Sequence, residues 1–181
     1  MCYRISLTKE NTNFDVLPVA LIKNYPLEKR YYKPYTQAKL CFSSDGLSCQ
    51  LMAFEAIPEK NSQLKLVLCF ETDLPFIVDI YSDNRKTAKI GETDVEDEVK
   101  FHFFNGEDLQ GKYWGANITL DNSTIKKYFN DFVIANNKKI SGNIFKLCEN
   151  GEKVHYGSLY PVDFKSKNPY EQYGEFIITD Y

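Results

Sequence analysis

Few residues in this chain have the types and spacing that catalysis requires. A catalytic site needs a nucleophile, a base and an orienting group close together. The two histidines, His102 and His155, are 53 positions apart, and for both the first interpretation is a structural or surface role, with function left open for His155. No GxSxG motif, no His-Glu-x-x-His motif and no glycine-rich phosphate loop occurs. The sequence therefore predicts a protein that is not an enzyme.

Four polar residues lie where they could bind a polar ligand. Glu55 ends a strand-like run, and Asp79 interrupts an apolar one, where a desolvated carboxylate demands a partner. Asn84 and Arg85 follow shortly after and could serve as that partner or as ligand contacts. The alternative for all four is a structural role, in which they bond to the backbone or to a charged neighbour.

Aromatic residues are unusually frequent, with 13 tyrosines, 13 phenylalanines and one tryptophan. Each tyrosine ring combines an apolar face with a polar tip, which suits both sandwich packing and sugar stacking. The candidates for stacking are Tyr156, Tyr160, Tyr170 and Tyr173 near the C-terminus and the single tryptophan, Trp114. Packing at the rim of a sandwich is the alternative for the tyrosines, and burial in the core is the alternative for Trp114.

Charge and hydropathy exclude several classes of partner. The chain has 22 basic and 25 acidic residues without a clustered basic face, so nucleic acid is not an expected partner. No apolar run approaches membrane-spanning length, and no secretory signal is visible. We expect no membrane partner, and a cytoplasmic location if the chain is complete.

No metal or cofactor is expected. The acidic residues within positions 92–98 lack the fixed offsets and sharp glycine turn of a calcium loop, so a structural calcium ion is unsupported. Five cysteines occur singly, their number is odd, and no CxxC pair is present. Reduced, buried thiols are the favoured interpretation, although Cys41 and Cys49 flank a turn and could face each other across a hairpin.

Strand patterns dominate the chain and predict a single domain over residues 1–181. Alternating or continuous apolar runs predict strands at residues 40–42, 47–54, 64–70, 76–81, 99–104 and 113–120, with further strands in the last forty residues. One helix is predicted at residues 123–132, because Ile125, Tyr128, Phe129 and Phe132 share one face. Short strands with one brief helix indicate an all-β antiparallel β-sandwich, jelly-roll-like in form.

The order of several short segments resembles the family 9 carbohydrate-binding modules. The segments are Tyr35-Thr-Gln-Ala-Lys-Leu40, Asp45-Gly-Leu47, Phe54-Glu-Ala-Ile-Pro58, His155-Tyr-Gly-Ser-Leu-Tyr-Pro161 and Tyr173-Gly-Glu-Phe176. The likeness covers positions 16 to 181 and points to the bacterial family 9-like branch. It implies a sandwich of two antiparallel sheets related to the DOMON domains, and a carbohydrate ligand.

The chain differs from the family at the sugar-binding site that the resemblance implies. Family members hold a terminal sugar between two tryptophans, and neighbouring strands supply a glutamate, an arginine and an asparagine. Here Phe164 and Tyr170 occupy the region of one tryptophan, and Lys65 stands where the glutamate is expected. The arginine and asparagine positions hold Ile77 and Asp79. A sugar site would therefore be rebuilt from tyrosines or be absent.

Two functional hypotheses remain after these observations. The first is a non-catalytic module that binds a mono- or oligosaccharide. The expected contacts are Trp114, Tyr156, Tyr160, Tyr170, Asp79, Asn84, Arg85 and Glu55. The second is a structural or protein-interaction sandwich that has kept the fold and lost the sugar site, with a protein as its partner.

Overall fold

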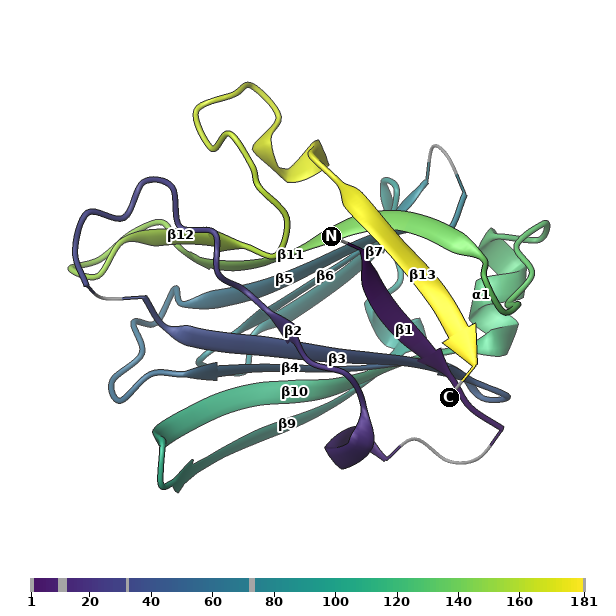
Figure 1. The fold of residues 1–181 in the computed structure, drawn as a ribbon, viewed down its shortest axis with the longest axis horizontal. Helices are drawn as coiled ribbons and strands as arrows, with labels where there is room; N and C mark the ends of the chain where they lie inside the picture. Colours follow the sequence, from purple (N-terminus) through teal and green to yellow (C-terminus); the bar gives the residue numbers. More distant parts are fainter. Residues whose placement is uncertain (1, 10–12, 32, 72–73, 181) are drawn as a thin grey trace.

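The structure, a computed structural model, describes residues 2–9, 13–31, 33–71 and 74–180. Its strands form one hydrogen-bonded sheet that curls until its two halves face each other as an upper and a lower layer (Figure 1). The strand order is β8-β7-β6-β5-β11-β13-β1-β3-β4-β10-β9, with β12 paired to β11 and β2 paired to β3.

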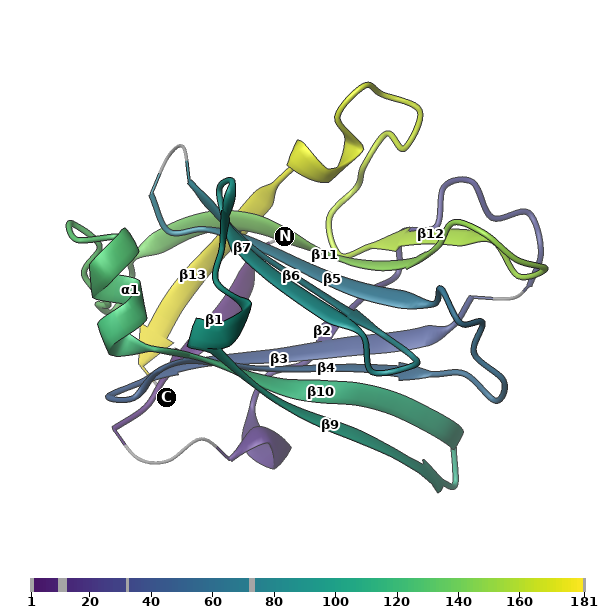
Figure 2. The same ribbon diagram turned by 180° about the vertical axis from the view of Figure 1, so that it is seen from behind.

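Each layer contains long strands separated by short connections. The upper layer contains β5 (Gln63–Cys69), β6 (Pro75–Tyr81), β7 (Lys86–Ile90), β8 (Thr93–Asp94), β11 (Lys139–Cys148) and β12 (His155–Ser158). The lower layer contains β3 (Tyr35–Ser43), β4 (Gly46–Phe54), β9 (Val99–Asp108) and β10 (Gly111–Asp121), with the short β2 (Ala20–Leu21) at the edge of β3. Two strands, β1 (Tyr3–Leu7) and β13 (Gly174–Asp180), cross obliquely between the layers, as Figures 1 and 2 show from opposite sides.

The all-β fold with one short helix is confirmed. Nearly all strand pairs are antiparallel, but β1 runs parallel to both of its neighbours, β13 and β3. The sheet is therefore mixed at the point where it passes from one layer to the other. In the described residues, short 3-10 turns also lie at Phe14–Val16, Glu96–Glu98 and Pro169–Glu171.

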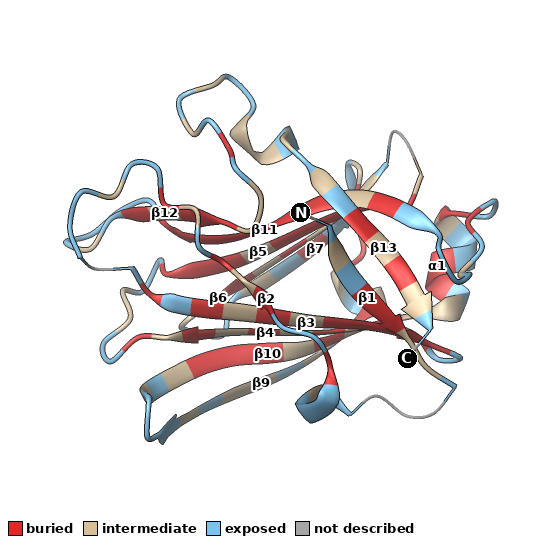
Figure 3. Cartoon of the chain, viewed as in Figure 1, coloured by how far each residue is buried: buried red, intermediate tan, exposed pale blue. Residues whose placement is uncertain are grey.

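The core lies between the two layers and follows the alternation of the strands. On β4 every second side chain is buried, beginning with Leu47 and ending with Ala53, while Ser48 and Phe54 face the other side. Successive strand residues point to opposite faces, so this pattern is expected for a layer with one covered face. Figure 3 shows the same banding along the long strands of both layers. The strand predicted at residues 47–54 is therefore present, with one face in the core.

The β3–β4 hairpin depends on Gly46. Its φ is 130°, a backbone conformation that residues with side chains rarely adopt. A Cβ atom added to Gly46 would lie 2.2 Å from the carbonyl oxygen of Leu120 on β10. Glycine at this position thus serves both the hairpin turn and the close approach of the neighbouring strand.

The helix α1 (Asn122–Tyr128) closes one end of the sandwich (Figure 1). Ile125, Phe129 and Phe132 are buried as the periodicity predicted. The helix ends four residues earlier than expected, and Phe129 leaves the helical conformation at φ −130°. Asn130 and Asp131, which follow it, are weak helix formers that favour turns, and Phe132 reaches the core through a turn bond to Phe129.

The five cysteines are free thiols, and all except Cys2 are buried. Cys49 pairs with Leu40 across the hairpin and Cys41 pairs with Ser48, so the two thiols are not opposite each other. Within the part of the chain that the structure describes, no helix has the length and hydropathy to cross a bilayer. Among the same residues, no group of three or more His, Cys, Asp or Glu side chains is placed to hold a metal ion.

Candidate functional site

The outer face of the upper layer, turned away from the core, carries a block of polar side chains. Lys65 on β5 pairs with Asp79 on β6, and Gln63 pairs with Tyr81. Residues paired directly across antiparallel strands share a face of the sheet, and so do residues two apart on one strand. These four side chains therefore form two adjacent rows on one face, which we call the outer face.

Asp79 is held by three neighbouring side chains on the outer face. Its carboxylate lies 2.7 Å from the ammonium of Lys65 and accepts a hydrogen bond of 2.5 Å from the amide of Gln63. Thr87 on β7 donates a third bond of 3.3 Å. The side chains of Lys65 and Asp79 remain 15% and 14% exposed. The partner that the sequence demanded for Asp79 is therefore Lys65, and the pair presents a fixed acceptor and a fixed donor to the surface.

Arg85 extends this polar surface at the turn between β6 and β7. Its guanidinium lies 4.4 Å from the ring centroid of Tyr81 and 2.8 Å from the carboxylate of Asp83. It also donates to the backbone carbonyl of Lys60 and to the side chain of Asn61, at 3.0 and 3.1 Å. These four contacts hold the planar guanidinium in place while half of the side chain is exposed.

The loop of residues 159–173 forms an aromatic wall beside the polar rows, rising above the upper layer in Figure 1. The ring of Tyr170 meets Phe145 on β11 edge-on at 5.4 Å, and the ammonium of Lys65 lies 5.6 Å from its centroid. Phe164 also packs on Phe145 and on the ring of Tyr156 from β12. The hydroxyl of Tyr170 donates to Glu149 at 2.5 Å. Burial, followed by the nearby Glu149 carboxylate, raises the pKa of Tyr170, so this hydroxyl stays a donor.

A single buried amide holds both ends of this loop. The Nδ2 group of Asn143 donates to the backbone carbonyls of Tyr160 and Gln172, at 3.3 and 2.9 Å. Its Oδ1 atom accepts from the backbone amides of Tyr160 and Ile144, at 3.0 and 2.9 Å. Asn143 is fully buried, so these four bonds are shielded from water. The wall is therefore fixed to β11 rather than free to swing.

A hollow of about 170 Å³ opens beside the two rows. Gln63, Tyr81 and Arg85 line it from one side, and Asn61, Glu149 and Asn150 complete it. Its lining is polar and carries both hydrogen-bond donors and acceptors around one aromatic ring. This arrangement suits a small neutral ligand with many hydroxyl groups.

Comparison with known proteins gives a consistent answer on the fold. No family model matches the sequence, and no curated protein matches it by sequence. Solved structures do match. A proposed carbohydrate-binding protein from Bacteroides uniformis superposes with a TM-score of 0.73 at 12% identity, over 98% of both chains. The chain has the fold of the family 9 carbohydrate-binding modules.

Two structures of a family 9 module from Caldicellulosiruptor kristjanssonii support that statement directly. The complex with glucose matches with a TM-score of 0.71 at 9% identity, over 100% of this chain and 97% of that one. The complex with cellotriose matches with a TM-score of 0.67 at 10% identity, over 98% and 94% of the two chains. At these identities the likeness establishes the family 9 fold and leaves the ligand to be argued from the side chains.

Of the residues expected from the sequence, four lie on or beside the outer face. Asp79, Arg85, Tyr156 and Tyr170 are brought together there by β6, its turn, β12 and the loop. Asn84 lies in the same turn with φ 66°, the left-handed conformation that asparagine tolerates. Its position is explained by the turn between β6 and β7.

Glu55 and Trp114 are instead inside the family 9 fold, and neither reaches the outer face. Trp114 is 5% exposed, and its indole nitrogen donates to Glu55 at 2.8 Å. Ser62 donates to the same carboxylate at 2.7 Å, and the ammonium of Lys146 lies 3.2 Å from it. His155 completes the cluster, 2.8 Å from the Lys146 nitrogen. Both sequence candidates are accounted for by this buried network rather than by a ligand.

Burial and neighbouring charges shift the pKa values of Glu55, Lys146 and His155 in this network. Burial by itself would raise the pKa of Glu55, but the Lys146 ammonium and bonds from Ser62 and Trp114 hold it below its ordinary value. Burial lowers the pKa of Lys146, against the attraction of Glu55. Burial and the adjacent Lys146 charge lower the pKa of His155 to about 4, so this ring is neutral at pH 7.

Tyr160 is held away from the outer face. Its hydroxyl accepts from the backbone amide of Tyr3 at 3.0 Å and donates to the carbonyl of Glu175. Its ring packs edge-on against Phe176 of the core. It therefore ties the loop to β1 and β13. His102 is exposed on β9 in the lower layer, so the two histidines are in different layers and form no joint site.

Several residues of the outer face were not among the sequence candidates for ligand contact. Gln63, Tyr81 and Glu149 gave no signal in the sequence, and Lys65 was noted only as a departure from the family pattern. One sequence signal was available for Lys65, since a cation within the apolar run 64–70 requires a partner as much as Asp79 does. Asn143 gave no comparable signal, because it follows Ser141 and Gly142 as well as preceding the apolar pair Ile144 and Phe145.

Proposed function

We propose that this protein is a non-catalytic carbohydrate-binding module and that a sugar binds at the outer face. The fold supports the proposal, since family 9 modules of the same fold were solved with glucose and with cellotriose. The observation that carries it is the outer face itself. There, the fixed Lys65–Asp79 pair lies beside the rings of Tyr170 and Tyr81.

Each group has a defined role in the proposed complex. The carboxylate of Asp79 accepts from sugar hydroxyls, while Lys65 and Arg85 donate to sugar oxygens. The rings of Tyr170 and Tyr156 contact the apolar C–H face of the sugar, in the place of the two tryptophans that the family uses. Preformed polar groups lose little freedom on binding, which favours recognition by this kind of surface.

A thermal-shift screen of mono- and disaccharides tests the proposal. A ligand that binds only the folded protein stabilises it by about 2.7 kcal/mol at one hundred times its Kd. For a chain of this length each kcal/mol raises Tm by roughly 2–4 °C, so a binding sugar should raise Tm by roughly 5–11 °C at that concentration. Asp79→Ala and Tyr170→Ala should abolish the shift.

Matched controls keep the test specific. Tyr35→Ala and Asp121→Ala remove an exposed tyrosine and a half-buried aspartate from the lower layer, away from the outer face. Both controls should retain the sugar-dependent shift. The proposal fails if no sugar raises Tm, or if the outer-face variants fold and bind as well as the controls do.

A protein-interaction sandwich without a sugar site is the second candidate function. It is favoured by one observation, namely that the single tryptophan, Trp114, is buried in the network with Glu55 and leaves no indole for a clamp. Flat melting curves with every sugar, together with a partner protein whose binding is lost in Tyr170→Ala, would support this alternative.

A further inference from the structure

The lower layer ends in a long strand that has a neighbour on one side. Strand β9 forms one end of the strand order, and among the described residues it is hydrogen-bonded to β10 alone. Figure 2 shows it as the outermost strand of the lower layer. Its ten residues pair with β10 without interruption, so no bulge turns this edge away from an incoming strand.

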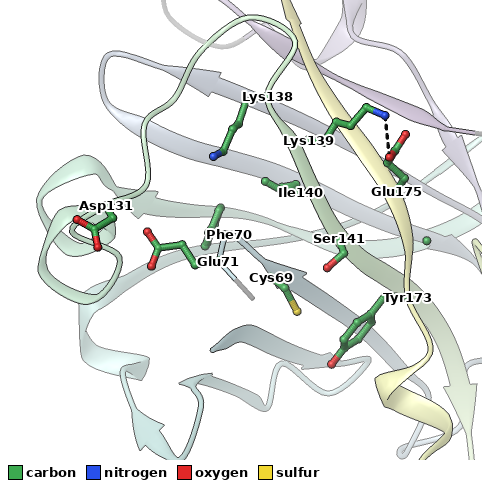
Figure 4. Close-up of a pocket in the computed structure, with 11 residues that line it drawn as sticks. Cys69, Phe70, Glu71, Asp131, Lys138, Lys139, Ile140, Ser141, Tyr173 and Glu175 are labelled. Carbon is green, nitrogen blue, oxygen red and sulfur yellow. Dashed lines mark ion pairs between the residues drawn. The ribbon is translucent and has the colours of Figure 1, made fainter. Parts of the chain in front are cut away.

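The other edges of the sheet are short or already covered. At the far end of the strand order β8 has two residues, and β2 beside β3 also has two. Strand β12 has four, and its Ser158 is bridged to Asn24. Strand β13 lies between β1 and β11, and the Lys139–Glu175 ion pair, at 3.0 Å, crosses from β11 to β13 (Figure 4). In the part of the chain that the structure describes, β9 is therefore the longest open edge.

The middle of β9 lacks the features that keep exposed edges apart. Natural edge strands are short, or they carry lysine, proline or a bulge. Between residues 101 and 106, β9 has no lysine, arginine, aspartate, glutamate or proline. The ring of Phe104 lies back over Gly115 on β10, where an added Cβ atom would be 2.9 Å from its Cζ atom. This ring therefore does not screen the outer side of the β9 backbone.

Charged residues of β9 lie at its two ends and have opposite signs. Lys100, near the start, bonds Asp121 of its own chain at 2.8 Å and keeps 72% of its side chain exposed. Glu107 and Asp108, at the end, are also exposed. In an antiparallel pair of two copies, the start of each strand meets the end of the other. Opposite charges then meet twice, which favours a second copy as the partner.

Two-fold symmetry limits the register of such a pair. Directly opposed residues share a face of the joined sheet, so the symmetry axis passes through a residue rather than between two. With the axis at Phe104, Lys100 of each copy opposes Asp108 of the other. Moving the axis by one residue places Lys100 opposite Gly106 or Gln110 and loses both charge pairs.

From this edge we propose that the protein forms a two-fold symmetric dimer in which β9 pairs antiparallel with β9 of a second copy. The pairing joins the two lower layers into one continuous sheet. Growth stops at two copies, because the far edge of each sheet is the two-residue β8. The interface is confined to one strand of each copy, so the dimer is weak and dissociates on dilution. The inference does not depend on the proposed function.

Sedimentation equilibrium tests the dimer. The average mass should rise from 21.0 kDa toward twice that value between about 1 and about 300 μM protein, the range expected of a small interface. Phe104→Lys places like charges opposite each other at the axis and should keep the protein monomeric throughout.

A charge reversal and its rescue test the register. Lys100→Glu should weaken the dimer by roughly tenfold, because like charges then oppose each other twice. Adding Asp108→Lys to this variant restores opposite charges and should restore the dimer. The matched control is Lys89→Glu, which makes the same change at an exposed lysine of β7 in the upper layer and should leave the dimer unchanged.

Amide hydrogen exchange locates the interface. Protection of the β9 amides should increase with protein concentration, while protection in β12 stays unchanged. A protein that stays monomeric at every concentration overturns the inference and leaves the proposed function standing. A dimer that persists unchanged in both Phe104→Lys and Lys100→Glu also overturns it. If Phe104→Lys does not fold, the charge reversal and its rescue decide the question.

Discussion

The buried ion pair between Lys146 and Glu55 allows a quantitative test of what stabilises this sandwich. Lys146 is 0% exposed and Glu55 is nearly so, with 3.2 Å between their charged atoms. Removing one partner of a buried pair leaves the other charge uncompensated, which costs about 3–5 kcal/mol. We expect Lys146→Met to fall at the lower end of that range, because Ser62 and Trp114 still donate to the remaining carboxylate.

Glu55→Gln should cost more than Lys146→Met, since it strands an ammonium group among the neutral neighbours His155, Ser62, a backbone carbonyl and the ring of Trp114. Each single loss corresponds to a fall in Tm of roughly 6–20 °C for a chain of this length. The double variant should lose much less than the sum of the single losses, because it leaves no unpaired buried charge.

Urea unfolding followed by fluorescence measures these losses, and the chain provides its own probe. Trp114 is the single tryptophan and donates to Glu55, so its emission reports on the network itself. The matched control is Lys100→Met, which breaks the exposed Lys100–Asp121 pair (72% and 36% exposed) and should cost no more than about 1 kcal/mol. The reasoning is refuted if Lys146→Met costs as little as this control, or if the single losses simply add.

Three further predictions concern pH, the loop and the hairpin. The pKa of His155 is about 4 in the folded protein, below its ordinary 6.5, so the unfolded chain binds the proton more readily. The contribution of His155 to the free energy of unfolding should therefore be fully present above pH 6.5. It should fall by on the order of 3 kcal/mol as the pH drops toward 4. Urea unfolding midpoints at pH 7 and pH 4.5 measure this loss of stability. If His155→Gln lost as much stability between these two pH values as the unsubstituted protein, His155 would not be the titrating group. Asn143→Ala removes four buried hydrogen bonds and should free the loop of residues 159–173. Amide hydrogen exchange should then become faster in that loop and stay unchanged in β4. Gly46→Ala should destabilise the protein by more than about 1 kcal/mol, because Gly46 has a φ of 130° and an added Cβ would be crowded by Leu120. The control is Gly111→Ala, since Gly111 also has a positive φ but no atom close to an added Cβ. It should cost less in the same unfolding assay.

Much of the fold could be predicted from the sequence because its signals are local. The alternation along residues 47–54 predicted the strand found there, and the stripe containing Ile125 and Phe129 predicted the helix. Both patterns depend only on the geometry of a single element. The parallel pairing of β1 with β13 and β3 was not predicted, because it joins segments that are not neighbours in the sequence, and β13 comes from the opposite end of the chain.

The candidate site was predictable in part for a similar reason. Asp79, Arg85 and Tyr170 were chosen for their chemistry, and the structure brings them to one face. Trp114 and Tyr160 have equally suitable chemistry, yet one bonds Glu55 in the interior and the other bridges β1 and β13. Side-chain type shows what a residue can bind, but its exposure depends on distant strands that cover it or leave it open.

Two lysines show where the information in the sequence ends. Lys65 and Lys146 each lie within an apolar strand, and sequence alone determined that each needs a partner. Their strands are adjacent, yet Lys65 points outward to Asp79 while Lys146 points inward to Glu55. Alternation along a strand determines which residues share a face of the sheet. Which of the two faces becomes the core is decided only when the second layer packs over it. Tertiary structure therefore made one lysine a surface donor and the other a fully buried charge.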